Sequence, residues 1–132
     1  MRAQGENLGG LSRVEALNRL LRALQSGSPD MEASALISED GLIIASALPQ
    51  HLDEARVAGM SATLLSLGSR AASELERGNV EEVLVRGSEG YAVMMAVGTT
   101  GTLLLTLSSR AAKLGLVFLD MRRAIEELRR IL

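Results

Sequence analysis

Cysteine is absent from this chain, and aromatic residues are nearly absent. The 132-residue sequence has no cysteine and no tryptophan, and its only aromatic side chains are those of Tyr91 and Phe118. Without cysteine, the chain has no disulfide, no thiolate metal ligand and no cysteine nucleophile. The core must therefore be built from leucine, valine, isoleucine, methionine and alanine, and there are few aromatic rings on which nucleic-acid bases could stack.

The chain also lacks an excess of positive charge and long apolar segments. Its formal net charge is −2, because 14 lysine and arginine residues stand against 16 aspartate and glutamate residues. Phosphate binding needs clustered cations, so we do not expect a nucleic acid as partner. The apolar runs have the length of a strand, well below the ~20 residues of a membrane-spanning helix, so we expect no membrane insertion. The first residues show no secretory signal, and we expect a cytoplasmic protein.

Histidine is scarce as well, which limits the candidates for catalysis. His51 is the only histidine, and no serine in a strand-to-helix turn accompanies it. Glu81 and Glu82 are adjacent, so they point to opposite faces of a strand. Glu39 and Asp40 offer too few oxygen ligands for a calcium site. We therefore expect no catalytic residue, no metal site and no cofactor, and a protein that is not an enzyme.

The spacing of apolar residues and turn residues predicts one domain. Ser12 and Glu15 fit a capping box at the start of a first helix, and Asp53 is a candidate N-cap for a second helix. We expect residues 1–10 to form a flexible tail and residues 11–132 to form the domain. The expected elements are helices at 12–26, 53–78 and 110–131, and strands at about 33–38, 42–47, 80–86, 91–97 and 102–107.

The predicted strands carry continuous apolar runs rather than alternating ones. Residues 42–45, 92–97 and 103–105 are such runs. An antiparallel sheet with one wet face alternates apolar and polar residues, so these runs predict a sheet that is covered on both faces. Three helices can supply both covering layers, which gives a three-layer α/β/α fold.

Three segments of the chain resemble the Roadblock family. Residues 35–46 resemble the first hairpin of its domains, residues 82–87 fit its strand meander, and residues 111–117 with the charged helix behind them resemble its last helix. The resemblance implies a profilin-like topology with a five-stranded antiparallel sheet in the order 2-1-5-4-3. It also implies that helices 1 and 3 lie on one face and helix 2 on the other. One departure from the family pattern is Lys113, where many members carry asparagine.

The resemblance also implies a function. Roadblock proteins form homodimers or heterodimers, and many bind or regulate Ras-like small GTPases, while others are light chains of dynein motors. This chain is most similar to bacterial and archaeal members, which include MglB-type regulators, so we expect a homodimer that acts as a non-catalytic regulator or adaptor of an MglA-type GTPase. Two alternatives stay open: a structural light chain or scaffold without GTPase regulation, and a small-molecule sensor.

The second helix is uncharged over residues 57–69, and its sides predict its contacts. At about 100° per residue, one apolar stripe should pack on the sheet; it contains Val57, Met60, Leu64, Leu67, Ala71 and Leu75. A second arc of mostly small residues is either sealed within its own domain or, as we favour, meets the same helix of a twin subunit; it contains Ala58, Ser61, Ala62, Leu65, Ser69 and Ala72. The polar arc is expected to bind the GTPase; it contains Arg56, Gly59, Thr63, Ser66 and Arg70.

In the implied strand order, the strand at residues 80–86 lies at an edge of the sheet. Such an edge must be blunted by charge or paired with another chain. Glu81, Glu82 and Arg86 can blunt it in a monomer. Val83 and Val85 can instead pair with the same strand of a second subunit across a two-fold axis. We expect this pairing, which adds Val83 and Val85 to the dimer interface.

Overall fold

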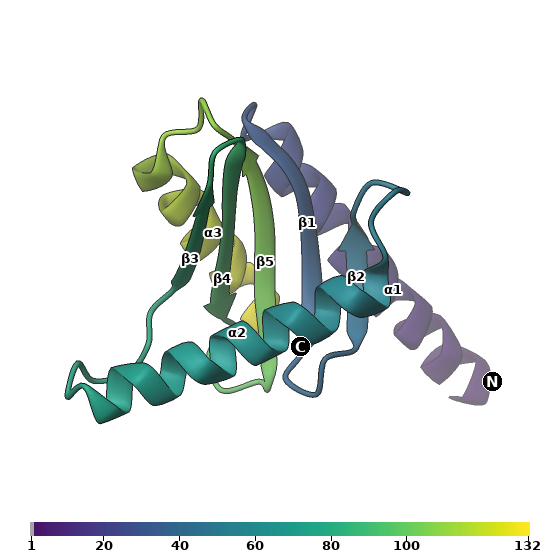
Figure 1. Ribbon diagram of the computed structural model, residues 1–132. Helices are drawn as coiled ribbons and strands as arrows, with labels where there is room; N and C mark the ends of the chain where they lie inside the picture. The colour runs from purple at the N-terminus through teal and green to yellow at the C-terminus, as the bar shows by residue number, and fades with distance from the viewer. Residues whose placement is uncertain (1) are drawn as a thin grey trace.

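The computed structural model describes residues 2–132, with the side chains of residues 12–132. In this part of the chain, two strands follow the first of three helices, and three strands separate the second helix from the third (Figure 1). Their bounds are α1 (Arg2–Ser26), β1 (Met31–Ser38), β2 (Ile43–Ala47), α2 (Glu54–Glu74), β3 (Val83–Gly87), β4 (Gly90–Ala96), β5 (Thr102–Ser109) and α3 (Leu114–Ile131). The strands form one antiparallel sheet in the order β2-β1-β5-β4-β3, which confirms the expected order.

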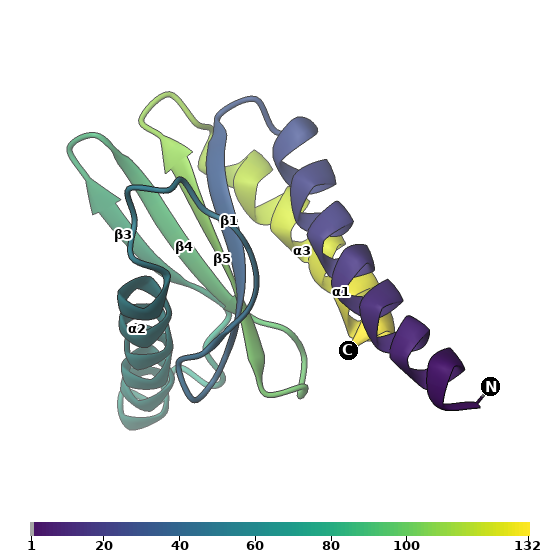
Figure 2. The same cartoon turned by 90° about the vertical axis from the view of Figure 1, so that its right-hand side faces the viewer.

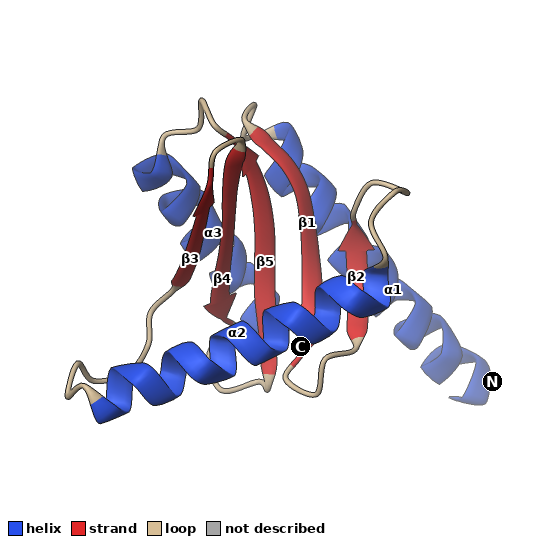
Figure 3. Cartoon of the chain, in the orientation of Figure 1, coloured by secondary structure: helices blue, strands red, loops and turns tan. Residues whose placement is uncertain are grey.

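The helices form a layer on each face of the sheet. Seen from the side, α2 lies on one face, and α1 and α3 lie together on the other (Figure 2). Coloured by element type, the front view shows α2 running across the strands rather than along them (Figure 3). The three-layer α/β/α arrangement is thus confirmed, and it explains the continuous apolar strands, because neighbouring strand residues face different helical layers.

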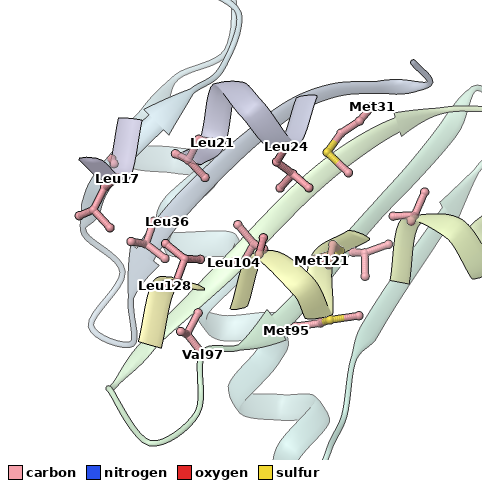
Figure 4. Packing of buried hydrophobic residues seen from close by; sticks show 14 of the residues in the cluster. Leu17, Leu21, Leu24, Met31, Leu36, Met95, Val97, Leu104, Met121 and Leu128 are labelled. Atoms are coloured by element: carbon pink, nitrogen blue, oxygen red, sulfur yellow. The ribbon is translucent and has the colours of Figure 1, made fainter. Parts of the chain in front are cut away.

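The larger core lies between the sheet and the layer of α1 and α3. Leu17 and Leu21 of α1 meet Leu36 and Leu104 of the sheet and Met121 of α3, and all five are almost completely buried (Figure 4). Burying a side chain of this size contributes about 1.5–3 kcal/mol. This cluster holds the two helices to the sheet without any aromatic residue among its fully buried members.

The smaller core lies between the sheet and α2. Ala58 of α2 packs with five strand residues, which are Ala35, Ile37, Met94, Leu103 and Leu105. Gly68 lets the helix approach closely, since a Cβ atom at this position would lie 2.5 Å from Cγ2 of Val83. Small residues therefore set the distance between α2 and the sheet.

The ends of several elements differ from those predicted. The first helix begins at Arg2 rather than at Ser12, so Ser12 and Glu15 lie inside the helix, where no free N–H groups need a capping box. Met1 lies outside the described residues, and the domain boundary at residue 10 stays a prediction. The edge strand begins at Val83, three residues later than expected, and α2 ends at Glu74 rather than near Gly78.

The N-termini of the two later helices show one correct and one wrong prediction. Asp53 is the N-cap of α2, and its carboxylate accepts a hydrogen bond from the backbone N–H of Arg56 at 3.2 Å. The last helix begins at Leu114 rather than near residue 110, because β5 extends to Ser109 and a turn follows it. Lys113 occupies its N-cap position and makes no side-chain capping hydrogen bond.

Candidate protein-binding surface

The two uncharged sides of α2 do not face the directions that the sequence predicted. Ala58 and Ser61 are buried on the chain's own sheet, and Ala62 and Leu65 pack against the same cluster. We expected this arc at a contact with a twin subunit, and the structure places it inside the domain instead. The alternative of a helix sealed by its own domain therefore describes these four residues. Ser69 lies outside this contact and is exposed.

The stripe that was expected to pack on the sheet faces outward. Met60 and Leu67 are each 55% exposed and Leu75 is 66% exposed, while Leu64 is 38% exposed. Within this stripe Val57 alone packs against the core cluster under α2. The sheet contact predicted for the stripe is thus wrong, because the small side of the helix allows the closer approach. Large apolar side chains remain on the surface.

The outward stripe lies next to a part of the sheet that α2 does not cover. The opposite flank of α2, with Ser66, Ser69 and Ser73, faces the turns that follow β1 and β4. The half of the sheet that α2 does not cross lies in the upper part of Figure 1. In that half, Val85 pairs with Ala92 and Ala92 pairs with Leu107 across three strands.

The exposed stripe of α2 and this row of the sheet lie on the same face of the domain. Val85 is 43% exposed, and Ala92 and Leu107 are half-buried at the edge of the smaller core. They lie on the α2 side of the sheet, because each is two residues from a side chain of the core under α2. We call the area the apolar shelf; it consists of Met60, Leu64, Leu67, Ala71, Leu75, Val85, Ala92 and Leu107. Exposed apolar residues that share one face of a domain are a candidate binding surface.

Strand β3 closes the shelf on one side and is an edge of the sheet, as expected. The outer edge of β3 pairs with no other strand of the described chain. Leu84 of this strand is 40% exposed. Among the described side chains near this edge, Glu82 forms a salt bridge with Arg122 at 3.9 Å, and the Arg86 guanidinium lies over the Tyr91 ring at 6.0 Å from its centroid. Figure 1 shows the C-terminal end of α2 running past β3. The edge and the shelf are therefore adjacent and face the same side of the domain.

The polar arc of α2 faces solvent, as a docking surface requires. Arg56, Thr63, Ser66 and Arg70 are exposed, and Arg70 forms an ion pair with Glu74 at 3.0 Å. That these residues bind a partner stays a prediction.

Gly59 of this arc has a structural role that the sequence reasoning missed. It is half-buried beside the turn between β1 and β2. A Cβ atom on Gly41 of that turn would lie 3.3 Å from its Cα atom. The Gly41 backbone is left-handed with φ of 84°, so the turn and the helix meet backbone to backbone.

Other candidates from the sequence stand apart from this surface. His51 lies exposed in the loop before α2. Among the side chains that the structure describes, no group of three or more histidine, aspartate and glutamate residues could hold a metal ion. Within the same part of the chain, no helix is long and apolar enough to cross a membrane.

Comparison with known proteins identifies the family and the fold of this chain. The sequence matches the Roadblock/LC7 domain over residues 17–108. An uncharacterized protein of Methanocaldococcus jannaschii, MJ1340, is 29% identical over 113 residues, which cover 86% of this chain and 96% of that protein. The Roadblock/LC7 domain from Streptomyces avermitilis has a similar structure, with a TM-score of 0.79, 24% identity and coverage of 86% of this chain and 94% of that one.

A second solved structure of the same fold is Myxococcus xanthus MglB. It has a TM-score of 0.80 and 22% identity, and the match covers 88% of this chain and 94% of that one. The profilin-like topology is shared with LokiProfilin1, at a TM-score of 0.62 and 14% identity over 89% and 98% of the two chains. The family match, which extends over more than half of the sequence, carries the assignment. The chain belongs to the Roadblock/LC7 domain family.

Proposed function

We propose that this protein is a homodimeric adaptor that binds and regulates a Ras-like small GTPase, with the two α2 helices as its docking platform. One observation carries the proposal: α2, the only described helix on its face of the sheet, exposes large apolar side chains and leaves part of that face uncrossed by a helix. A small soluble adaptor domain is what the Roadblock/LC7 family match supports. The similarity of fold to MglB favours a GTPase as partner.

The geometry suggests how two copies fit together. A two-fold axis perpendicular to the sheet beside β3 would pair the two β3 edges in one continuous sheet. The same rotation brings the overhanging end of the partner's α2 over the open row of the first copy, formed by Val85, Ala92 and Leu107. The two α2 helices then run antiparallel with their apolar flanks in contact. In this arrangement Val85 contributes to the interface as expected, whereas the buried arc of α2 does not.

The polar arcs of both α2 helices would face the same side of such a dimer. Two copies of Arg56, Thr63 and Arg70 then present a surface without large apolar side chains, which suits a reversible partner. The dimer would regulate the GTPase by binding one nucleotide state more tightly than the other, since only differential affinity can shift such an equilibrium. Nucleotide and Mg²⁺ would be held by the GTPase.

Sedimentation equilibrium at micromolar concentration tests the dimer. We expect a mass of about 28 kDa, twice the 14.0 kDa of one chain. If the protein has the mass of one chain across the micromolar range, it is a monomer, and the proposed platform of two α2 helices is wrong.

Titration of purified Ras-like GTPases from the same genome tests the partner. We expect the affinities for the GDP form and for the form with a non-hydrolysable GTP analogue to differ at least about tenfold. Equal affinity for both forms would indicate a scaffold without regulation. No binding to any of them, with an intact dimer, would contradict the GTPase proposal.

A further inference from the structure

The polar flank of α2 borders a groove that the proposed dimer leaves open. The groove runs between α2 and the two turns that follow β1 and β4, on the side of the helix away from the apolar shelf. Its volume is about 830 Å³, within the range of pockets that bind ligands. Its floor is apolar and consists of Leu65, Ala96 and Leu103.

Hydrogen-bond acceptors and carboxylates surround this floor. Ser66, Ser69 and Ser73 line the α2 side with three hydroxyl groups. Glu39 and Asp40 stand on the opposite wall, in the turn between β1 and β2. Neither carboxylate forms a salt bridge with the side chains that the structure describes. The one arginine of the lining, Arg70, is already paired with Glu74, so the groove has an unbalanced negative charge.

The position of Glu39 is fixed by the neighbouring turn. Its backbone N–H donates to the carbonyl oxygen of Gly101 at 2.9 Å, which ties the turn after β1 to the turn after β4. A Cβ atom at Gly101 would lie 3.6 Å from a carboxylate oxygen of Glu39, an ordinary contact distance, so this side chain lies beside the turn after β4. The backbone of Glu39 is therefore fixed at the groove by the hydrogen bond between the two turns.

The wider charge distribution reinforces the groove. Residues 27–109, which form the sheet and the α2 layer, contain eleven carboxylates and four arginines. Residues 12–26 and 110–132, which form most of the α1 and α3 layer, contain nine cations and four carboxylates. The sign of charge thus differs between the two layers. A cationic partner is attracted toward the α2 side, where the groove lies.

We propose that the groove binds a segment of a partner protein that carries arginine or lysine next to an apolar side chain. The cation would contact Glu39 and Asp40, its remaining N–H groups would donate to the serine hydroxyls, and the apolar side chain would cover Leu65, Ala96 and Leu103. A polyamine would satisfy the charges but leave the floor uncovered. A metal ion would find two carboxylates in a turn, far fewer ligands than it needs.

This inference does not require the partner to be a GTPase. The groove is formed within one chain and lies on the flank of α2 opposite to the proposed dimer contact. Its occupation can therefore be measured whether or not the dimer and GTPase proposals hold.

Selection of displayed random peptides on the immobilised full-length protein tests the proposal without a known partner. We expect the selected peptides to share a basic residue beside leucine, isoleucine or valine. In solution, the double substitution Glu39→Lys with Asp40→Lys should weaken the binding of a selected peptide at least about tenfold, because like charges then meet in the groove. The matched control reverses two exposed carboxylates of the opposite layer, Glu15→Lys with Glu127→Lys, and should change binding less than about twofold.

Two further measurements keep the result clear. Circular dichroism shows whether both variants fold. If the double lysine variant does not fold, the neutral double variant Glu39→Gln with Asp40→Asn takes its place. Spermine serves as a second probe. Selection of no peptides, selection of peptides without basic residues, or equal binding to the groove variant would overturn the proposal. Tight spermine binding that displaces the peptide and equals it in affinity would show a polyamine site instead.

Discussion

At the scale of single residues, glycine and alanine decide where α2 lies. Leu64 and Leu67 are more apolar than Ala58 and Gly68, yet the small residues face the sheet. A close approach lets the strand side chains fill the space under the helix at the density of a protein core. The cost is an exposed row of large side chains, which the proposed dimer would cover.

The two glycines of α2 provide a direct test of this account. Gly68→Ala should lower the free energy of unfolding by about 1–2 kcal/mol, since the new methyl group overlaps Val83, a stiff neighbour. Gly59→Ala adds the same methyl group in the same helix, where nothing lies within 4 Å of it. That variant should be more stable by about 0.5–1 kcal/mol. Urea denaturation of both variants measures the difference, and equal effects would contradict the close-packing role of Gly68.

The N-terminus of α3 offers a second test at this scale. Lys113 stands at the N-cap with extended backbone but cannot accept a hydrogen bond from the free N–H groups of the first turn. Lys113→Asn supplies an acceptor and should raise stability by about 1 kcal/mol, or about 3–5 °C in melting temperature. Lys113→Ala removes the charge without adding an acceptor and is the control. If both variants melt alike, capping is not the cause.

At the scale of elements, the sequence predicted the type and order of every helix and strand but not which side of α2 is inside. Helices α1 and α3 have one apolar and one charged face, so their buried residues, such as Leu21 and Met121, follow from periodicity. Helix α2 has no charge over residues 57–69. Hydrophobicity alone then favours the larger side chains for the core, whereas the sheet selects the side that fits.

The groove could not be predicted from the sequence either. The predicted strands at 33–38 and 42–47 place Glu39 and Asp40 correctly in the connection between them, but the neighbours of these two residues come from residues 62–74 of α2 and from the turn near Gly101. These contacts between distant segments depend on how α2 crosses the strands. The apolar runs of the sequence do not encode that angle.

Two adjacent leucines of α2 separate dimerisation from folding. Leu64 belongs to the exposed shelf and Leu65 packs on the core under the helix. Leu64→Asp should leave the circular dichroism spectrum and the melting of the monomer nearly unchanged, while it weakens the dimer at least about tenfold, because a charge is then buried at the contact. Leu65→Asp should instead destabilise the fold by several kcal/mol. Sedimentation and thermal melting of both variants decide, and a Leu64→Asp protein that remains dimeric would place the contact elsewhere.

At the scale of the whole molecule, the chain separates its charges and its apolar surface. The apolar shelf contains no ionisable side chain, the groove carries unpaired carboxylates, and the α1 and α3 layer is rich in arginine. Two surfaces of different chemistry therefore lie on opposite flanks of one helix. They respond differently to salt, since screening weakens contacts between exposed charges and leaves apolar contacts almost unaffected.

This difference gives a prediction that distinguishes the two surfaces in a single protein. Between about 50 and 500 mM NaCl, where the Debye length falls from above 10 Å to about 4 Å, the dissociation constant of the dimer should change less than about threefold. Over the same range, the affinity for a basic peptide in the groove should fall at least about tenfold, as its contact with Glu39 and Asp40 is screened. Analytical ultracentrifugation and peptide titration at each salt concentration measure both. A dimer that dissociates as salt rises would show that charged residues, rather than the apolar shelf, hold the two copies together.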